Sequence, residues 1–133
     1  MAIDTLLGKK EKIFVFGDDF PTKDGSGVRD YIHVEDIAEA HTLVINNFDK
    51  AQNEVFNLGT NEGYSVLEII NTVNRLYNVN LLYEIKNRRP GDPAALVASY
   101  RKIKNLLGWE PKRGLDNIIV SALEWRKNPR YKK

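Results

Sequence analysis

Two stretches of the sequence contain arginine side chains suited to holding a diphosphate. Arg29 follows the turn Gly25-Ser26-Gly27, and two more guanidinium groups lie in Arg88-Arg89-Pro90-Gly91-Asp92-Pro93. A guanidinium presents a planar fork of donors that matches phosphate oxygens, and it stays charged at any relevant pH. Two such groups from distant loops could clamp one diphosphate, and Asp92 beside them could accept hydrogen bonds from ribose hydroxyl groups.

A third stretch, Phe14-Val15-Phe16-Gly17, offers an aromatic strand end that could receive a flat base while backbone groups read its edge. Together the three stretches describe a nucleotide-diphosphate site. The alternative is that Arg29 and Asp30 are ordinary surface ions and that residues 88–92 form a local turn with an ion pair. Surface charges are common and each pair contributes little, so composition alone leaves both interpretations open.

The elements that must position these residues alternate between strands and helices. The patterns predict strands at 13–16, 54–58 and 81–85, an extended segment at 29–34, a surface loop at 18–27, and helices at 34–48, from 66 to about 76, at 99–107 and at 115–126. Ser65 and Glu68 form a capping box before the second helix, and Gly108 is a natural left-handed cap for the third. This order predicts an α/β fold with α+β character.

Length and composition predict one domain over residues 1–133. Hydrophobic residues make up 42% and charged residues 29%, as in globular proteins, and no apolar run is long enough for a bilayer. With no cysteine there is no disulfide, thiolate nucleophile or zinc finger. The N-terminal charges follow the apolar stretch, the reverse of a secretory signal, so we expect a cytoplasmic protein. The basic residues near the C-terminus (Arg126, Lys127, Arg130, Lys132 and Lys133) are expected to form a solvated tail, not a nucleic-acid surface.

The stretch Phe16-Gly17-Asp18-Asp19-Phe20-Pro21-Thr22-Lys23-Asp24-Gly25, followed by Val28-Arg29-Asp30-Tyr31-Ile32-His33-Val34, is similar to the signature of UDP-glucose 4-epimerases in the extended short-chain dehydrogenase/reductase superfamily. Further matches are Asn57-Leu58-Gly59, Ser65-Val66-Leu67-Glu68, Arg88-Arg89-Pro90-Gly91-Asp92-Pro93-Ala94, Leu107-Gly108-Trp109-Glu110-Pro111 and Trp125. The resemblance runs in order from about Ile13 to Tyr131, nearly the whole chain.

This resemblance implies an isomerase that interconverts UDP-glucose and UDP-galactose. It also implies substrate contacts by Phe14, Val15 and Phe16 (uracil), Arg29 and Arg89 (diphosphate), Asp92 (ribose) and Leu96 (sugar ring). In the family a small residue at the last position admits N-acetylated sugars. Leucine is intermediate in size, so a preference for UDP-glucose and UDP-galactose over N-acetylated forms is expected.

The resemblance also implies NAD as cofactor and a catalytic tyrosine–lysine pair, both placed by the family in a long region that would precede Met1. Residues 1–133 are therefore expected to be the C-terminal, UDP-sugar-binding part of a Rossmann-type fold. We expect an incomplete sheet, no NAD-binding domain, no catalytic, cofactor-binding or metal-binding residue, and no activity alone. The family's homodimer interface would be mostly absent, and an exposed edge at residues 54–58 predicts self-association.

Two stretches mimic the missing features. Gly25-Ser26-Gly27-Val28-Arg29-Asp30 begins like a dinucleotide fingerprint, but Asp30 stands where the third glycine belongs and a strand follows it. Tyr100 and Lys104 have the spacing of the superfamily's catalytic pair, yet they come after the substrate turn with no nucleotide-binding unit before them.

Four further residues invite a functional interpretation. We expect His41 to be a hydrogen-bonded core residue, and Trp109 and Trp125 to provide packing. His33 lies in an extended segment, and two histidines without nearby carboxylates make no persuasive metal site.

Two alternatives to the epimerase stay open. The chain could be a stand-alone UDP-sugar-binding or partner-binding module, which UDP affinity would reveal. It could also belong to another sugar-nucleotide enzyme of the superfamily, such as a decarboxylase or dehydratase, although the Gly-Asp-Asp-Phe-Pro-Thr loop argues against this.

Overall fold

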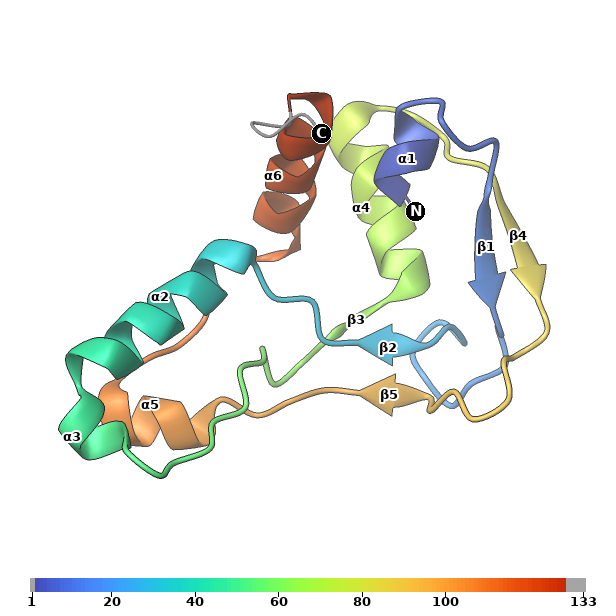
Figure 1. The fold of residues 1–133 in the computed structure, drawn as a ribbon. Helices are drawn as coiled ribbons and strands as arrows, with labels where there is room; N and C mark the ends of the chain where they lie inside the picture. The colour runs from blue at the N-terminus through green and yellow to red at the C-terminus, as the bar shows by residue number, and fades with distance from the viewer. Residues whose placement is uncertain (1, 129–133) are drawn as a thin grey trace.

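Short strands and helices alternate along the chain, as the sequence predicts. The computed structural model describes residues 2–128, so the basic residues from Arg130 onward lie outside the described part. Its elements are α1 (Ala2–Leu6), β1 (Ile13–Phe16), β2 (Val28–Arg29), α2 (Val34–Asn46), α3 (Phe48–Ala51), β3 (Tyr64–Ser65), α4 (Val66–Tyr77), β4 (Tyr83–Lys86), β5 (Ala95–Leu96), α5 (Arg101–Leu107) and α6 (Leu115–Lys127). Figure 1 shows α1, α4 and α6 grouped on one side of the strands, and α2, α3 and α5 grouped at the far end.

The strands form two small sheets. β1 and β4 are parallel, with Phe16 paired to Lys86 at their carboxyl ends. β2 lies between β3, which is antiparallel, and β5, which is parallel and places Leu96 opposite Arg29. The mixed helix and sheet architecture with few strands confirms the predicted α/β fold with α+β character.

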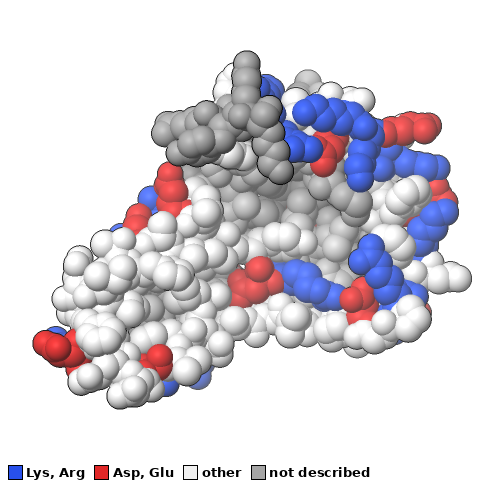
Figure 2. Space-filling model, viewed as in Figure 1, with Lys and Arg blue, Asp and Glu red and all other residues white. Residues whose placement is uncertain are grey.

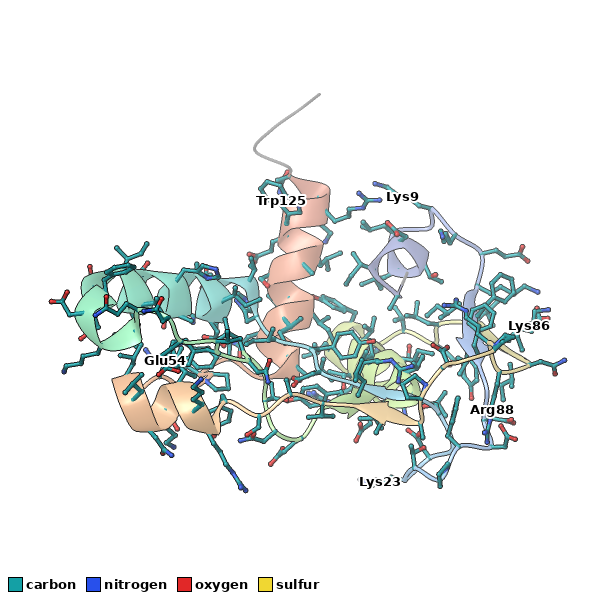
Figure 3. All side chains as sticks on the ribbon, turned by 60° about the horizontal axis from the view of Figure 1, so that its bottom comes forward. Lys9, Lys23, Glu54, Lys86, Arg88 and Trp125 are labelled. Carbon is teal, nitrogen blue, oxygen red and sulfur yellow. The ribbon has the colours of Figure 1, made fainter. Side chains whose placement is uncertain are left out.

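Two hydrophobic clusters support these elements. The larger joins the inward side chains of β1, Ile13 and Val15, to α4 and α6, and it includes Ile70, Val73, Leu81, Leu115 and Ile119. The smaller joins α2 to α5 through Ala40, Ile103 and Trp109. Trp109 is buried, which confirms its packing role. Trp125 is 52% exposed near the C-terminal end of α6 (Figure 3), so its packing role stays a prediction.

Local capping signals set the helix ends. The Ser65 hydroxyl accepts the Glu68 amide at 3.0 Å and the Glu68 carboxylate accepts the Ser65 amide at 2.7 Å, which confirms the capping box of α4. Gly108 ends α5 at φ 77°, the left-handed conformation that glycine adopts without strain. Helix α5 begins at Arg101, two residues later than predicted.

The extended segments differ more from the prediction. Residues 54–58 form no strand in the described structure, because no described neighbour supplies a hydrogen-bonding ladder for them. The segment at 29–34 pairs only at Arg29, and β4 is shifted from the predicted 81–85 to Tyr83–Lys86. A strand forms only where a neighbouring strand pairs with it, so a sequence pattern alone predicts the bounds of a strand less well than those of a helix.

Helix α2 turns much of its apolar stripe outward. Its buried residues are Asp36 and Ala40, whereas Val34, Ile45 and Phe48, at the start of α3, are 70%, 72% and 63% exposed. His41 is exposed and its Nδ1 lies 2.8 Å from the Ile37 carbonyl oxygen, so the expectation of a core histidine is wrong. Figure 2 shows few charged groups over much of the end of the molecule formed by α2, α3 and α5. None of the described helices is long and apolar enough to cross a membrane.

Candidate functional site

A cavity of about 400 Å³ lies beside β1, between β2 and the helices α1, α4 and α6. Five of the seven predicted site residues line it, namely Phe14, Phe16, Arg29, Arg89 and Asp92. The rest of its lining is largely apolar side chains from the three helices. The predicted diphosphate and base residues therefore share one concave surface.

The parallel pairing of β1 and β4 explains why two distant loops meet here. Both strands end at the same edge, and the Gly17 amide continues the pairing with a 2.8 Å hydrogen bond to the Lys86 carbonyl. The loop at 17–27 and the turn at 87–94 therefore leave side by side. The Val28 amide then donates to the Ala94 carbonyl at 2.8 Å, which brings β2 and Arg29 against the end of that turn.

The Arg29 guanidinium is held by the turn it faces. Its Nη1 donates to the carbonyl oxygens of Val28 at 2.7 Å and Pro93 at 3.0 Å. Its Nη2 lies 3.4 Å from Asp92 Oδ1. These contacts fix the side chain while leaving it 28% exposed, so part of the fork stays open to an incoming anion.

The aromatic side chains of β1 carry cations on their faces. The Arg89 guanidinium carbon lies 3.7 Å from the centre of the Phe16 ring, and Lys12 and Lys86 place their ammonium groups 5.7 and 5.2 Å from the centre of Phe14. Such stacking is attractive because the ring face is electronegative. Figure 2 shows Lys and Arg side chains gathered on this side of the molecule. The arrangement suits a ligand that combines a flat ring with negative charge.

Two predicted contact residues do not line the cavity. Val15 is 1% exposed, because alternate side chains of β1 point into the core, so only its backbone could reach a base. Leu96 lies on β5 opposite Arg29 and is 63% exposed outside the cavity. The proposed roles of both residues stay predictions.

Besides the apolar wall, Phe20, Gly27 and Tyr31 line the cavity and were not among the predicted site residues. The last could have been found, because Arg29 and Tyr31 are two apart on an extended segment and so share one side of it. Burial raises the pKa of the Tyr31 hydroxyl, with the charge of Arg29 opposing that effect. A neutral phenol at this position could donate a hydrogen bond to an anion.

Asp30 points to the other side of the same segment and holds the fold together. Its carboxylate accepts the Thr60 amide at 3.0 Å, the Thr60 hydroxyl at 2.8 Å and the Ala98 amide at 2.9 Å. These bonds join β2 to the loop before β3 and to the segment after β5. Asp30 is thus an internal anchor, and its interpretation as an ordinary surface ion is wrong.

The fingerprint-like turn at Gly25 makes no helix. Gly25 has φ 80°, and a Cβ there would lie 1.9 Å from the Asp18 carbonyl oxygen, so the tight turn requires glycine. The chain then enters β2. No strand, glycine-rich turn and helix in succession occurs within residues 2–128.

Tyr100 lies just before α5 and Lys104 lies on it, and neither residue lines the cavity. The hydrogen bond from Lys104 to Glu110 raises the pKa of the lysine ammonium. The Lys104 ammonium also lies 5.7 Å from the centre of the Tyr100 ring. Tyr100 packs edge-on against Trp109, with ring centres 6.2 Å apart.

His33 caps a helix. Its Nδ1 accepts the Glu35 amide at 3.1 Å, so the neutral ring carries its proton on Nε2, which lies 2.8 Å from the Ser121 hydroxyl. A proton on Nε2 prevents that nitrogen from acting as a base toward Ser121. Among the described residues no three histidine or carboxylate groups gather as metal ligands do.

Comparison with known proteins places this geometry in a family. The sequence profile described as GDP-mannose 4,6 dehydratase matches residues 1–121. The UDP-glucose 4-epimerase of Bifidobacterium longum is 46% identical over 124 residues, which is 92% of this chain and 36% of that protein. The UDP-glucose 4-epimerase of Bacillus subtilis is 44% identical over 121 residues, 90% of this chain and 36% of that protein.

Solved structures agree. One UDP-glucose 4-epimerase superposes with a TM-score of 0.90 at 43% identity, covering 99% of this chain and 41% of that one. The Bifidobacterium longum enzyme in complex with NAD⁺ and UDP gives 0.85 at 42% identity, covering 96% and 38%. NAD is the cofactor of these relatives. The chain spans little more than a third of the curated relatives' length. It belongs to the family described as GDP-mannose 4,6 dehydratase, within the short-chain dehydrogenase/reductase superfamily, and it corresponds to the C-terminal portion of epimerases in that group.

Proposed function

We propose that the chain is the nucleotide-sugar-binding portion of an enzyme that interconverts UDP-glucose and UDP-galactose. The observation that carries this proposal is the cavity itself. Arg29 on β2 and Arg89 in the 87–94 turn line one concave surface together with two phenylalanine rings. The identity to UDP-glucose 4-epimerases over nine-tenths of the chain supports the same substrate.

In this proposal each cavity residue has one task. Arg29 and Arg89 neutralise the diphosphate, and the ring faces of Phe14 and Phe16 receive the uracil. Asp92, now 3.4 Å from Arg29, accepts hydrogen bonds from the ribose hydroxyl groups once phosphate oxygens occupy the guanidinium fork. Only a small movement of the Asp92 side chain is needed, because Asp92 and Arg29 already lie beside each other.

Leu96 is proposed to contact the sugar ring. It is exposed beside Arg29 in the β2–β5 pairing, so a sugar that extends from the diphosphate can reach it. We propose a preference for UDP-glucose and UDP-galactose over UDP-N-acetylglucosamine. Leu96→Ser should raise the relative affinity for the N-acetylated ligand in calorimetric titrations. An unchanged ratio of the two dissociation constants would remove Leu96 from this role.

Hydride transfer is not assigned to these residues. NAD accepts and returns a hydride in relatives that bind it, and residues 2–128 contain no strand, glycine-rich turn and helix in succession of the kind that holds its pyrophosphate. We therefore expect no conversion of UDP-galactose by the purified chain with added NAD. We further propose a cytoplasmic location, with a UDP-sugar as partner and no nucleic acid or membrane.

Titration calorimetry with UDP tests the binding role. We expect weak binding by the chain and about tenfold weaker binding after Arg29→Met or Arg89→Met, the loss of one hydrogen bond to a charged group. Arg75→Met is the matched control, since Arg75 pairs with Asp116 outside the cavity. Failure of the parent chain to bind UDP, or equal affinity in all four proteins, would refute the proposal.

A further inference from the structure

Arg88 is a second arginine in the 87–94 turn, and unlike Arg89 it does not line the cavity. Its Nε donates to Asp19 Oδ1 at 2.6 Å, and its Nη2 donates to the Asp19 carbonyl oxygen. Its guanidinium carbon lies 4.1 Å from the centre of the Phe20 ring. One side chain of the turn therefore grips both the backbone and two side chains of the 17–27 loop. Figure 3 shows Arg88 beside that loop, which also carries Lys23.

The space for this contact is reserved by Gly17. A Cβ on Gly17 would lie 2.6 Å from Phe20 Cε2 and 2.8 Å from Arg88 Cγ, and the residue has φ 88°, which favours glycine. The Phe20 ring and the stem of Arg88 thus pack directly on the backbone at the end of β1. Phe20 is 7% exposed and also lines the cavity, so the contact with Arg88 reaches the cavity through a buried ring.

Arg88 and Arg89 are adjacent in the turn, and their guanidinium groups stack on different rings, Arg88 on Phe20 and Arg89 on Phe16. Anchoring Arg88 therefore restricts where the neighbouring Arg89 side chain can lie. We propose that Arg88, held by Asp19 and Phe20, is a positioning residue: it fixes Arg89 for the diphosphate of the nucleotide and does not itself contact the nucleotide. We name these three residues the loop latch. This inference rests on the proposed function and adds a determinant of affinity whose charged groups, Arg88 and Asp19, do not line the cavity.

The direction in which Asp19→Asn changes the affinity for UDP separates the loop latch from simple charge effects. If Asp19 acted only through its charge, Asp19→Asn would remove a negative group near the diphosphate and strengthen UDP binding. If Asp19 acts by holding Arg88, the same substitution weakens binding. Arg88→Lys keeps the charge but loses the planar fork, so it too should weaken binding only if positioning matters.

The experiment is titration of the chain with UDP by calorimetry, with thermal unfolding of every variant measured by circular dichroism. We expect Asp19→Asn and Arg88→Lys each to weaken UDP binding about fivefold, the upper range for one exposed ion pair. Asp116→Asn breaks the Arg75 pair, which has the same 2.6 Å separation outside the cavity, and should leave UDP affinity unchanged.

The outcomes distinguish this inference from the proposed function. If the parent chain binds UDP and Arg29→Met weakens it, but Asp19→Asn binds equally or more tightly, the loop latch is refuted and the proposed function stands. If the parent chain binds no UDP, both fall. If Asp19→Asn unfolds, Arg88→Lys decides, since it preserves the net charge and the packing of the side-chain stem on Gly17.

Discussion

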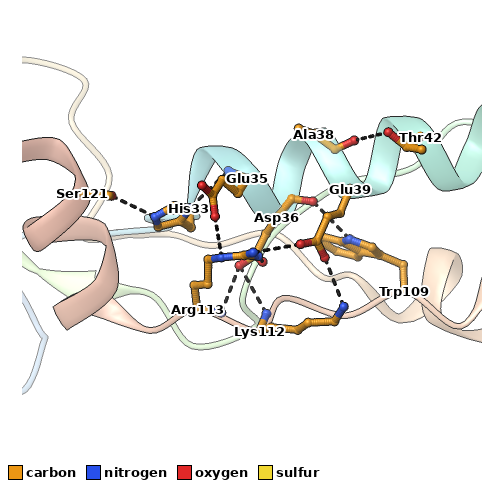
Figure 4. A network of polar contacts seen from close by, with 10 residues as sticks. All are labelled: His33, Glu35, Asp36, Ala38, Glu39, Thr42, Trp109, Lys112, Arg113 and Ser121. Atoms are coloured by element: carbon orange, nitrogen blue, oxygen red, sulfur yellow. Dashed lines mark hydrogen bonds and ion pairs between the residues drawn. The ribbon is translucent and has the colours of Figure 1, made fainter. Parts of the chain in front are cut away.

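The buried carboxylate of Asp36 gives the sharpest test of how α2 is held against the loop between α5 and α6. Asp36 is fully buried in the first turn of α2. Its Oδ2 accepts the backbone amides of Lys112 at 3.2 Å and Arg113 at 3.1 Å, and its Oδ1 accepts Arg113 Nη1. Figure 4 shows this network, in which Arg113 also reaches the carboxylates of Glu35 and Glu39, each at 2.9 Å. Asp36 thus holds the loop between α5 and α6 against α2.

We expect Asp36→Ala to lower the free energy of unfolding by about 3 kcal/mol, the lower end of the range for breaking a buried ion pair. The lower end applies because Arg113 keeps two other carboxylate partners. The loss comes mainly from two backbone amides that no longer have their acceptor, each costing about 1–2 kcal/mol where water enters poorly. The small cavity left by the side chain accounts for the remainder.

Urea unfolding followed by circular dichroism measures this change, provided that the slope m stays constant. A loss of about 3 kcal/mol should lower Tm by about 10 °C for a chain of this size. Glu62→Ala removes an exposed carboxylate in the turn before β3 and should change stability by less than about 0.5 kcal/mol. If Asp36→Ala costs less than about 1 kcal/mol, the carboxylate does not hold the loop and the reasoning is wrong.

Three further predictions concern the surface and the turns. Hydrogen bonds from two lysines lower the pKa of Glu84 to about 2 from 4.5, so its contribution to stability is present above pH 4.5 and is lost as the pH falls toward 2. Glu84→Gln should therefore flatten the dependence of Tm on pH in that window, and an unchanged profile would contradict this. Ile45→Glu with Phe48→Glu should reduce self-association in sedimentation experiments without lowering Tm, because both side chains are exposed; unaltered sedimentation would show that this face is not responsible. Gly59→Ala places a Cβ 2.3 Å from a carboxylate oxygen and should cost about 2 kcal/mol in urea unfolding, whereas Gly114→Ala, with open space around it, should cost less than half of that.

Helices were predictable from the sequence because their signals are local. The capping box at Ser65 and Glu68 and the left-handed cap at Gly108 are complete within a few residues, and the structure uses both. The face that a helix buries was less predictable. The stripe containing His41 is apolar, yet α2 buries Asp36 instead, because the Asp36 carboxylate finds its partners on the loop before α6. A polar group can occupy the buried face when all its hydrogen bonds are met.

The site was predictable where it depends on residue type and less so where it depends on register. Arg29 and the pair Arg88 and Arg89 stood out by their guanidinium groups, and the family resemblance singled out Arg89 from that pair. The parallel β1–β4 pairing brings the segments that carry Arg29 and Arg89 together at the cavity, and their contact with a ligand stays a prediction. The direction of each side chain follows from strand alternation, which places Val15 in the core and Tyr31 in the cavity. The apolar wall supplied by α1, α4 and α6 comes from tertiary packing that no local motif encodes.

The stretch from Arg29 to His33 contains both cavity-lining residues and structural anchors. Arg29 and Tyr31 face the cavity, Asp30 ties β2 to two neighbouring segments, and His33 caps α2. Substitutions at these positions therefore differ in what a loss of nucleotide binding means. At Asp30 or His33, loss of binding can follow from loss of the fold, since their side-chain bonds are internal. At Arg29, whose guanidinium is partly exposed, a loss of binding with unchanged Tm reports on contact with the ligand itself. Variants of Arg29 therefore test the ligand contact, and variants of Asp30 and His33 in the same stretch serve as controls for loss of the fold.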